Sequence, residues 1–208
     1  MADEIYLNYA NRMRKVRAFQ FFGITPQWHP ETKDIEGFCH DEVVRQFHDT
    51  RDWNDGGKRV EGMLNAWHYA QGNAFHTPGV QDIKTLGAMV EPDYNINGGE
   101  FRHENVYIGD RMGVYPPFLA QSVDILVTRA GAVAPGTAHE GFVNWLQIED
   151  FKNQAEDITS VDEWYLAYEW IHPFRDGNGR TGKILYNWLN GTLDDPVLVK
   201  DYFGGGNP

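Results

Sequence analysis

The sequence predicts an all-α, mostly helical domain that carries one small β-hairpin. Over most of the 208 residues, apolar side chains recur every three to four positions, which is the spacing of one helix face. One segment, 97–115, breaks this spacing and places glycine-rich turns on both sides of a short strand-like stretch. Hydrophobic residues make up 41% of the chain, so we expect one domain with a sizeable core.

Eight stretches carry the helical spacing, and we expect a helix at each of them: 5–19, 43–47, 60–67, 80–90, 119–127, 142–146, 164–171 and 184–189. Pro116 and Pro117 favour a helix start before the fifth stretch. Ser160 and Glu163 form a capping-box pattern before the seventh, and Gly191 is placed to end the last. Loops are expected at 52–58 and 131–136, with a loose tail at 204–208.

The net charge of −12 argues against a protein that coats nucleic acid, since such proteins are usually basic. Cys39 is the only cysteine, so an internal disulfide is impossible, which suits a reducing compartment. The first residues lack a signal-peptide core, and no apolar run is long enough to span a membrane. We therefore expect a cytoplasmic protein without a nucleic-acid or membrane partner, and a homodimer is possible.

The segment 172–183, His-Pro-Phe-Arg-Asp-Gly-Asn-Gly-Arg-Thr-Gly-Lys, carries most of the chemistry. Its glycines can bring backbone N–H groups close to an anion, and the helix expected after them would point its positive end at a phosphate. Asp176 can hold Mg²⁺ beside phosphate oxygens, and Arg180 offers a fork of donors. His172 can accept a proton near neutral pH. The segment predicts a nucleotide site with a base beside it.

A P-loop is one interpretation of this segment, because Gly177 to Lys183 fits G-x-x-x-x-G-K. The next residue, Ile184, lacks the hydroxyl that a P-loop uses for Mg²⁺. A helix is expected before the glycines, where a P-loop needs a strand. Both observations argue against a P-loop.

The segment instead resembles the signature of Fic-domain proteins, H-x-F-x-[D/E]-G-N-G-R-x-x-R, with Lys183 in place of the final arginine. The resemblance implies a Fic fold and transfer of AMP from ATP to a Ser, Thr or Tyr hydroxyl of a target protein. It implies that His172 is the catalytic base and that Asp176 binds Mg²⁺. The phosphate-binding residues that it implies are Gly177, Asn178, Gly179, Arg180 and Lys183.

Upstream, Thr32-Lys33-Asp34-Ile35-Glu36-Gly37 is similar to the family's inhibitory-helix motif, [S/T]-x-x-x-E-[G/N]. Alone the pattern fits an ordinary polar helix start, but its position before the signature favours the inhibitory interpretation. In the family the motif's glutamate pairs with the second signature cation, so we expect Glu36 to pair with Lys183 and to restrain activity. Thr32 and Gly37 complete the motif.

The resemblance also divides the chain. We expect a single Fic-type domain over 1–208, with an N-terminal helical extension at 1–31, an inhibitory-helix region at 32–60, a Fic core at 61–191 and a C-terminal tail at 192–208.

Family members carry a flap before the signature, where a target segment aligns as an added strand. The corresponding residues here are Phe101, Arg102, Val106 and Ile108, and the alternative is an ordinary surface hairpin. Two other functions stay open. One is a de-AMPylating enzyme in which Glu36 orients water, and the other is a catalytically silent nucleotide-binding or interaction module.

Overall fold

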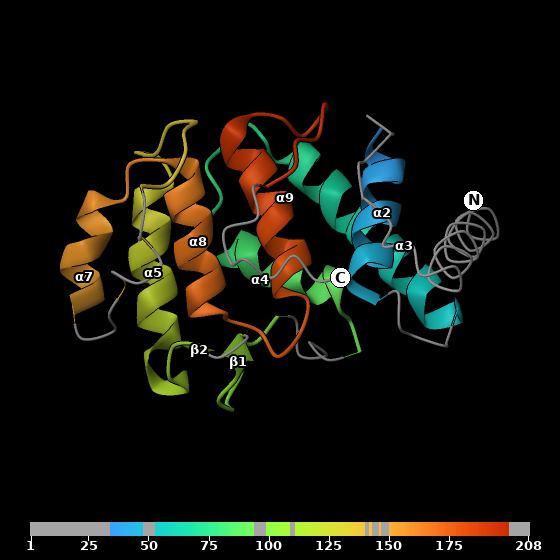
Figure 1. The fold of residues 1–208 in the computed structure, drawn as a ribbon. Helices are drawn as coiled ribbons and strands as arrows, with labels where there is room; N and C mark the ends of the chain where they lie inside the picture. The colour runs from blue at the N-terminus through green and yellow to red at the C-terminus, as the bar shows by residue number, and fades with distance from the viewer. Residues whose placement is uncertain are drawn as a thin grey trace, which may run out of the picture.

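The computed structural model describes residues 34–47, 53–93, 99–108, 111–139, 142, 146 and 150–199 (Figure 1). Its α-helices are α2 (Ile35–Phe47), α3 (Trp53–Gly72), α4 (Val80–Val90), α5 (Leu119–Arg129), α7 (Phe151–Gln154), α8 (Val161–Ile171) and α9 (Asn178–Asn190). Two short 3-10 helices are η1 (Pro116–Phe118) and η3 (Ala155–Asp157). Strands β1 (Tyr107–Ile108) and β2 (Arg111–Met112) pair antiparallel. The predicted fold class, mostly helical with a small hairpin, is confirmed.

The helices pack side by side around α8 and α9, which occupy the middle of the molecule (Figure 1). Helix α8 packs between α5 and α9, while α9 also contacts α3 and α4. Every residue of α8 is buried, which is expected of a helix covered on all sides. The end of α8 is therefore held firmly, and the signature segment follows directly from it.

Helix α8 begins and ends where the sequence predicts. Ser160 caps the start: its Oγ accepts a hydrogen bond from Glu163 N at 3.2 Å, and its own N–H donates to Glu163 Oε2 at 3.1 Å. His172 ends the helix with φ 51°, in the left-handed region that few residues other than glycine adopt. Gly191 (φ 68°) terminates α9, the helix that begins within the signature, as predicted.

One predicted loop is wrong. The sequence suggested a loop at 52–58 because of Asn54, Asp55, Gly56 and Gly57, yet α3 begins at Trp53. Both glycines are buried, so packing of the helix start outweighs their weak helix propensity. The loop predicted at 131–136 is confirmed, since it lies outside the helices between α5 and α7.

The hairpin lies where it was predicted, but its strands have only two residues each. Residues 100–106, the first part of the strand-like stretch, are not a strand. Arg102 explains this, because its N–H donates to Pro173 O at 2.9 Å and so ties the chain to the signature segment.

Several expectations fall outside the described residues: the helix at 5–19, the extension 1–31, Thr32 and the tail 204–208. The predicted helix at 142–146 lies mostly outside as well, although Phe142 and Leu146 are described and buried. The beginning of the predicted tail 192–208 is packed on α3, where Trp67 Nε1 donates to Leu193 O at 2.8 Å. No helix within the described ranges has the length and apolar character needed to cross a bilayer.

Candidate active site

His172 lies at the end of α8, with a fifth of its side chain exposed. Its Nδ1 is 3.2 Å from the backbone oxygen of Glu169 and 3.8 Å from Glu169 Oε2. Because both neighbours are hydrogen-bond acceptors, we place the ring proton on Nδ1. The lone pair then resides on Nε2, which is free to accept a proton from a substrate.

The surroundings of His172 favour its neutral form. Burial lowers the pKa of the ring to about 4, and the nearby Arg102 cation acts in the same direction, while the hydrogen bond to Glu169 and the charge of Asp176 oppose them. The imidazole is therefore neutral at pH 7, as a general base must be.

Arg102 fastens the flap to the signature segment. Its guanidinium group donates to four backbone oxygens, those of His172 (2.7 Å), Ile171 (3.2 Å), Val114 (2.5 Å) and Glu104 (2.6 Å). Only 4% of Arg102 is exposed. This side chain was expected to dock a target, but four of its five N–H donors bond backbone oxygens of the protein itself.

The other flap residues include both packed and exposed side chains. Phe101 packs its ring against the Phe174 ring, with 5.8 Å between their centres. Val106 and Ile108 are half-buried, whereas Tyr107 between them is 70% exposed. Tyr107 is thus an exposed aromatic side chain on the flap, and sequence reasoning missed it because an exposed aromatic residue carries no periodic signal.

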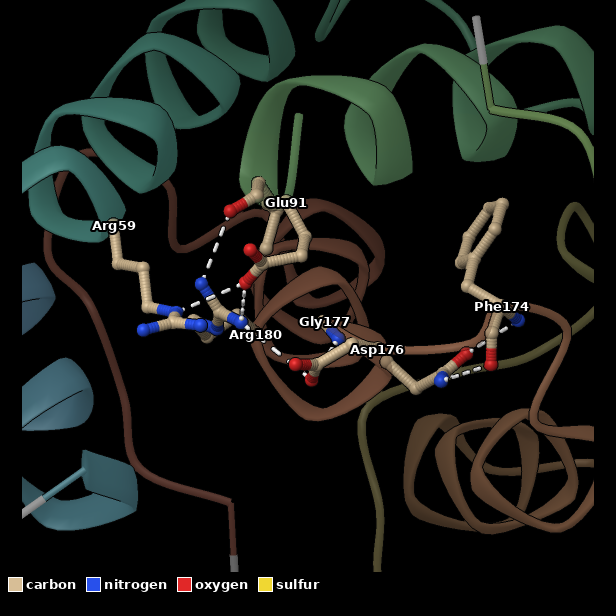
Figure 2. Close-up of polar contacts among 8 residues, drawn as sticks. Arg59, Glu91, Phe174, Asp176, Gly177 and Arg180 are labelled. Carbon is tan, nitrogen blue, oxygen red and sulfur yellow. Dashed lines mark hydrogen bonds and ion pairs between the residues drawn. The ribbon is translucent and has the colours of Figure 1, made fainter. Parts of the chain in front are cut away.

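The turn between α8 and α9 is held by a pair of hydrogen bonds from one side chain. Asn178 Oδ1 accepts from Phe174 N at 2.9 Å, and Asn178 Nδ2 donates to Phe174 O at 2.8 Å (Figure 2). The Asn178 amide therefore stabilises the turn, and its contact with a phosphate stays a prediction. Phe174 is fully buried against α4, where a Cβ on Gly87 would lie 2.5 Å from its ring.

The start of α9 follows directly from the turn at Gly177. Gly177 has φ 80°, a conformation that glycine adopts without strain. The first helical hydrogen bond runs from Thr181 N to Gly177 O at 2.9 Å. The N–H groups of residues 178–180, including Gly179, therefore lie ahead of the helical ladder at the positive end of α9.

Asp176 lies at the same turn, with 39% of its side chain exposed. Its Oδ1 accepts from Gly177 N at 2.6 Å. Mg²⁺ fits this donor, because Mg²⁺ is usually bound by one or two carboxylates together with substrate phosphates. Within the described ranges, no group of three or more His, Cys, Asp or Glu residues forms an all-protein metal site.

Arg180 is fully buried and points at the end of α4 (Figure 2). Its Nη1 donates to Val90 O at 3.0 Å and its Nη2 to Glu91 Oε2 at 2.6 Å. Arg59, from α3, donates its Nε to the same Glu91 oxygen at 3.1 Å. The cation expected to bind phosphate thus takes part in an ion triad, Arg59–Glu91–Arg180.

Lys183 has a different partner from the one expected. Its Nζ pairs with Glu42 Oε1 on α2, and both side chains are buried. Glu36 pairs with His40 at 3.5 Å and keeps 49% of its side chain exposed. The expected Glu36–Lys183 pairing is therefore wrong: Glu42, almost two helical turns further along α2, lies where Lys183 reaches that helix.

Sequence reasoning missed Arg59, Glu42 and Glu91. Arg59 and Glu42 are ordinary charged residues within helices, Glu91 directly follows α4, and their spacing in the sequence gives no signal. Their importance arises only because packing brings α2, α3 and α4 against α9.

Comparison with known proteins identifies the family. The sequence model of the family described as Fic/DOC matches residues 75–189, more than half of the chain and all of the signature. Similar proteins include "Protein adenylyltransferase Fic" of Drosophila mojavensis, 37% identical over 97 residues. The protein of the same name from Culex quinquefasciatus is 34% identical over 95 residues. Each match covers 45% of this chain but only 15% of the relative, so the chain spans less than a fifth of these proteins.

Among solved structures, a Fic family protein from Desulfovibrio desulfuricans G20 is similar, with a TM-score of 0.47 and 14% sequence identity. The match covers 89% of this chain and 57% of that one.

Proposed function

We propose, because this chain belongs to the Fic/DOC family, that it transfers AMP from ATP to a hydroxyl group of a target protein. The observation that carries the proposal is that a neutral His172 at the end of α8 is joined by a single turn to the start of α9, whose first backbone N–H groups can bind an anion. The relatives named protein adenylyltransferases support the same reaction.

In this reaction His172 Nε2 takes the proton from a Ser, Thr or Tyr hydroxyl. The hydroxyl oxygen forms a bond to the α-phosphorus of ATP, the bond from that phosphorus to the bridging oxygen breaks, and pyrophosphate leaves. The backbone N–H groups of residues 178–180 are positioned to stabilise charge that builds on the α-phosphate.

Asp176 is the residue that would hold Mg²⁺. When bound, Mg²⁺ would neutralise charge on the ATP phosphates. The hydrogen bond from Gly177 N fixes Asp176 Oδ1, so the carboxylate is already oriented before a metal arrives. Binding of Mn²⁺ as a paramagnetic probe, compared between the wild type and Asp176→Asn, tests this assignment without relying on activity.

The proposal also holds that α2 restrains AMP transfer, and that Glu42, not Glu36, supplies the inhibitory carboxylate. Lys183 is the second cation of the signature, and it pairs with Glu42 in a buried position. While that pair is intact, Lys183 is not available to a γ-phosphate. Lysine is also a flexible point charge, so it would grip either partner less firmly than the arginine of the signature.

The test uses ATP labelled at either the α- or the γ-phosphate, with this chain and candidate target proteins. The proposal is supported if the wild type transfers the α-label to a target protein and His172→Ala does not. Transfer of the γ-label would instead indicate phosphorylation. Absence of both, with release of AMP from an AMPylated protein, would indicate the de-AMPylating alternative. Nucleotide binding without either reaction would indicate a silent binding module.

A further inference from the structure

We propose that Glu169 is a positioning residue for the reaction: its carboxylate orients the His172 imidazole and stabilises the positive charge that the ring acquires when Nε2 takes the substrate proton. This inference rests on the proposed function, which it extends by assigning a role to a residue outside the signature. Glu169 lies on α8, three residues before His172.

The contact between the two residues has a backbone part and a side-chain part. His172 Nδ1 is 3.2 Å from Glu169 O and 3.8 Å from Glu169 Oε2. The backbone oxygen can fix the proton on Nδ1, but it carries no full charge. The carboxylate adds a negative charge on the same side of the ring, which leaves Nε2 for the substrate.

The carboxylate has a defined place between α8 and α9, which pack against each other. Glu169 is only 6% exposed. A Cβ built on Gly182 of α9 would lie 2.6 Å from Glu169 Oε1 and 3.0 Å from the ring of Tyr165. The carboxylate thus fills the space that a side chain at residue 182 would need, and the close packing holds it beside the base.

The chemistry of the base explains why a carboxylate is useful here. Burial lowers the pKa of His172 to about 4, which keeps the ring neutral but makes it a weak base at pH 7. Proton transfer then places a positive charge on the same buried ring. A negative charge 3.8 Å from Nδ1 favours that charged form over the neutral one. Glu169 therefore stabilises the transition state more than the resting enzyme.

No proton passes through Glu169 in this step. The proton of the target hydroxyl moves to His172 Nε2 while the hydroxyl oxygen bonds to the α-phosphorus of ATP and pyrophosphate leaves. The proton on Nδ1 stays there, and Glu169 neither gains nor loses one. This is the role of the carboxylate in a Ser-His-Asp triad, which holds the imidazole and stabilises the imidazolium.

Other charged and titratable groups face the pair from the elements around it. Arg102, from the flap, disfavours a positive charge on His172, whereas Asp176, from the signature turn, favours it. Tyr168 on α8 is fully buried, and burial followed by the charge of Glu169 raises the pKa of its hydroxyl, so this group stays neutral at pH 7. Glu169 and Asp176 therefore act together against Arg102.

Reaction with diethyl pyrocarbonate tests the inference without AMP transfer, because this reagent is attacked by the unprotonated nitrogen of a neutral imidazole. Glu169→Gln keeps the shape of the side chain and removes its charge. We expect the rate at His172 at pH 7, measured by peptide mass spectrometry, to fall by about threefold or more. His68 is the internal reference and should keep its rate, since it is exposed on α3 with its Nδ1 3.1 Å from Gln71 Oε1.

This readout separates a positioning role from a structural one. A variant that only loosens α8 would expose His172 further and raise its rate, the opposite of the expected change. Glu163→Gln is the matched control, because it removes the same charge from the other end of α8. It should leave the His172 rate within about 1.5-fold of the wild type, since the two residues lie far apart on the helix.

AMP transfer supplies a second readout. Glu169→Gln should lower kcat by about tenfold and leave KM for ATP unchanged, because Glu169 acts on the base and not on the nucleotide. Glu169→Asp keeps the charge but withdraws it from Nδ1, so its kcat should lie between the two. In the His172→Ala background, Glu169→Gln should have no further effect, since Glu169 acts through the imidazole.

An unchanged or faster reaction of His172 in Glu169→Gln overturns the inference and leaves Glu169 as a packing residue. Should Glu169→Gln fail to fold, Glu169→Asp decides: a slower reaction at His172 supports the inference, and an unchanged one overturns it. A chain that shows the expected His172 rates but transfers no AMP contradicts only the proposed function. A chain that transfers AMP with the same kcat in Glu169→Gln and the wild type contradicts only the inference.

Discussion

Lys183 and Glu42 form a buried ion pair that joins the helix of the signature segment to α2. The two residues lie far apart in the sequence, and the pair replaces the expected contact between Lys183 and Glu36. Removal of one member of such a pair leaves a buried charge without compensation, which is costly. The free energy of unfolding of suitable variants therefore shows whether Lys183 contacts Glu42 or Glu36.

Double-mutant cycles measure this contact. For Lys183→Met combined with Glu42→Gln, we expect a coupling energy of about 0.5–3 kcal/mol in the free energy of unfolding, because the side chains touch. The matched cycle with Glu36→Gln should give less than about 0.5 kcal/mol. Urea unfolding of the variants provides the values. Coupling to Glu36 instead of Glu42 would restore the original expectation for the inhibitory motif.

His172→Ala should lower kcat for AMP transfer by about 10²–10⁴-fold, the usual loss when a general base is removed. Nucleotide affinity should stay close to that of the wild type, because His172 has no proposed contact with the phosphates. Equal turnover of the variant and the wild type on one target would refute the assignment of the base.

The pH dependence of kcat/KM gives an independent check on His172. Its pKa lies at about 4, below the ordinary value of 6.5, so the ring loses its proton early as pH rises. Activity should be flat between about pH 6 and 8 on this account and fall only as pH approaches 4. Circular dichroism at each pH separates titration from unfolding. An acid limb centred near pH 6.5 would contradict a buried, neutral imidazole.

The flap prediction concerns the backbone of Tyr107. Gly113 N donates to Val106 O at 3.0 Å, and bonded pairs alternate along an antiparallel ladder, so the Tyr107 N–H points away from β2. If a target adds a strand at this edge, Tyr107→Pro should reduce target modification by about tenfold, while ATP affinity is unchanged. Tyr107→Ala is the control, since it removes the exposed ring but keeps the N–H. Modification at the wild-type rate by Tyr107→Pro would leave the flap as a surface hairpin.

Glu163 should make stability depend on pH. Burial alone would raise the pKa of its carboxyl, but hydrogen bonds from Thr159, His139 and Ser160 outweigh it and lower the pKa to about 2, against an ordinary 4.5. Between these values the unfolded chain binds more protons than the folded one. The stabilisation is therefore fully present above pH 4.5 and is lost as pH falls toward 2.

Glu163→Gln should accordingly lower the free energy of unfolding by about 1 kcal/mol or more at pH 7, and the difference from the wild type should narrow at pH 3. Urea unfolding at both pH values measures it. The exposed Glu156→Gln serves as the control, with an expected change under about 0.5 kcal/mol at either pH. A constant difference at pH 7 and pH 3 would mean that Glu163 acts by packing and not by charge.

The helices could be predicted from the sequence because their signals are local. The stripe at 80–90, the capping box of Ser160 and Glu163 and the terminal Gly191 each act within a few residues, and all appear in the structure. The wrong loop at 52–58 failed because packing decided the conformation of its glycines. Local patterns predicted a helix or its end correctly wherever the packing of the folded chain favoured the same conformation.

The candidate site was only partly predictable, for the same reason. The signature segment predicts the base and the anion-binding turn; in the structure His172 ends α8, and Gly177 N donates to Asp176 Oδ1 just before α9. The partners of the two cations could not be predicted, because Glu42 lies on α2 and Glu91 directly follows α4, both far from the signature in the sequence. Arg102 likewise turns inward, to backbone oxygens of Ile171 and His172 that become its neighbours only in the folded protein.

The four hydrogen bonds of Arg102 have a mechanical consequence. They join the end of α8 to both sides of the hairpin, so the flap edge and His172 belong to one rigid frame. A target strand aligned on that edge would meet the imidazole at a fixed offset along its length. The protein would then select a target hydroxyl by its position along the bound segment. Ser, Thr and Tyr at that position would differ only in the distance from the backbone to the hydroxyl oxygen.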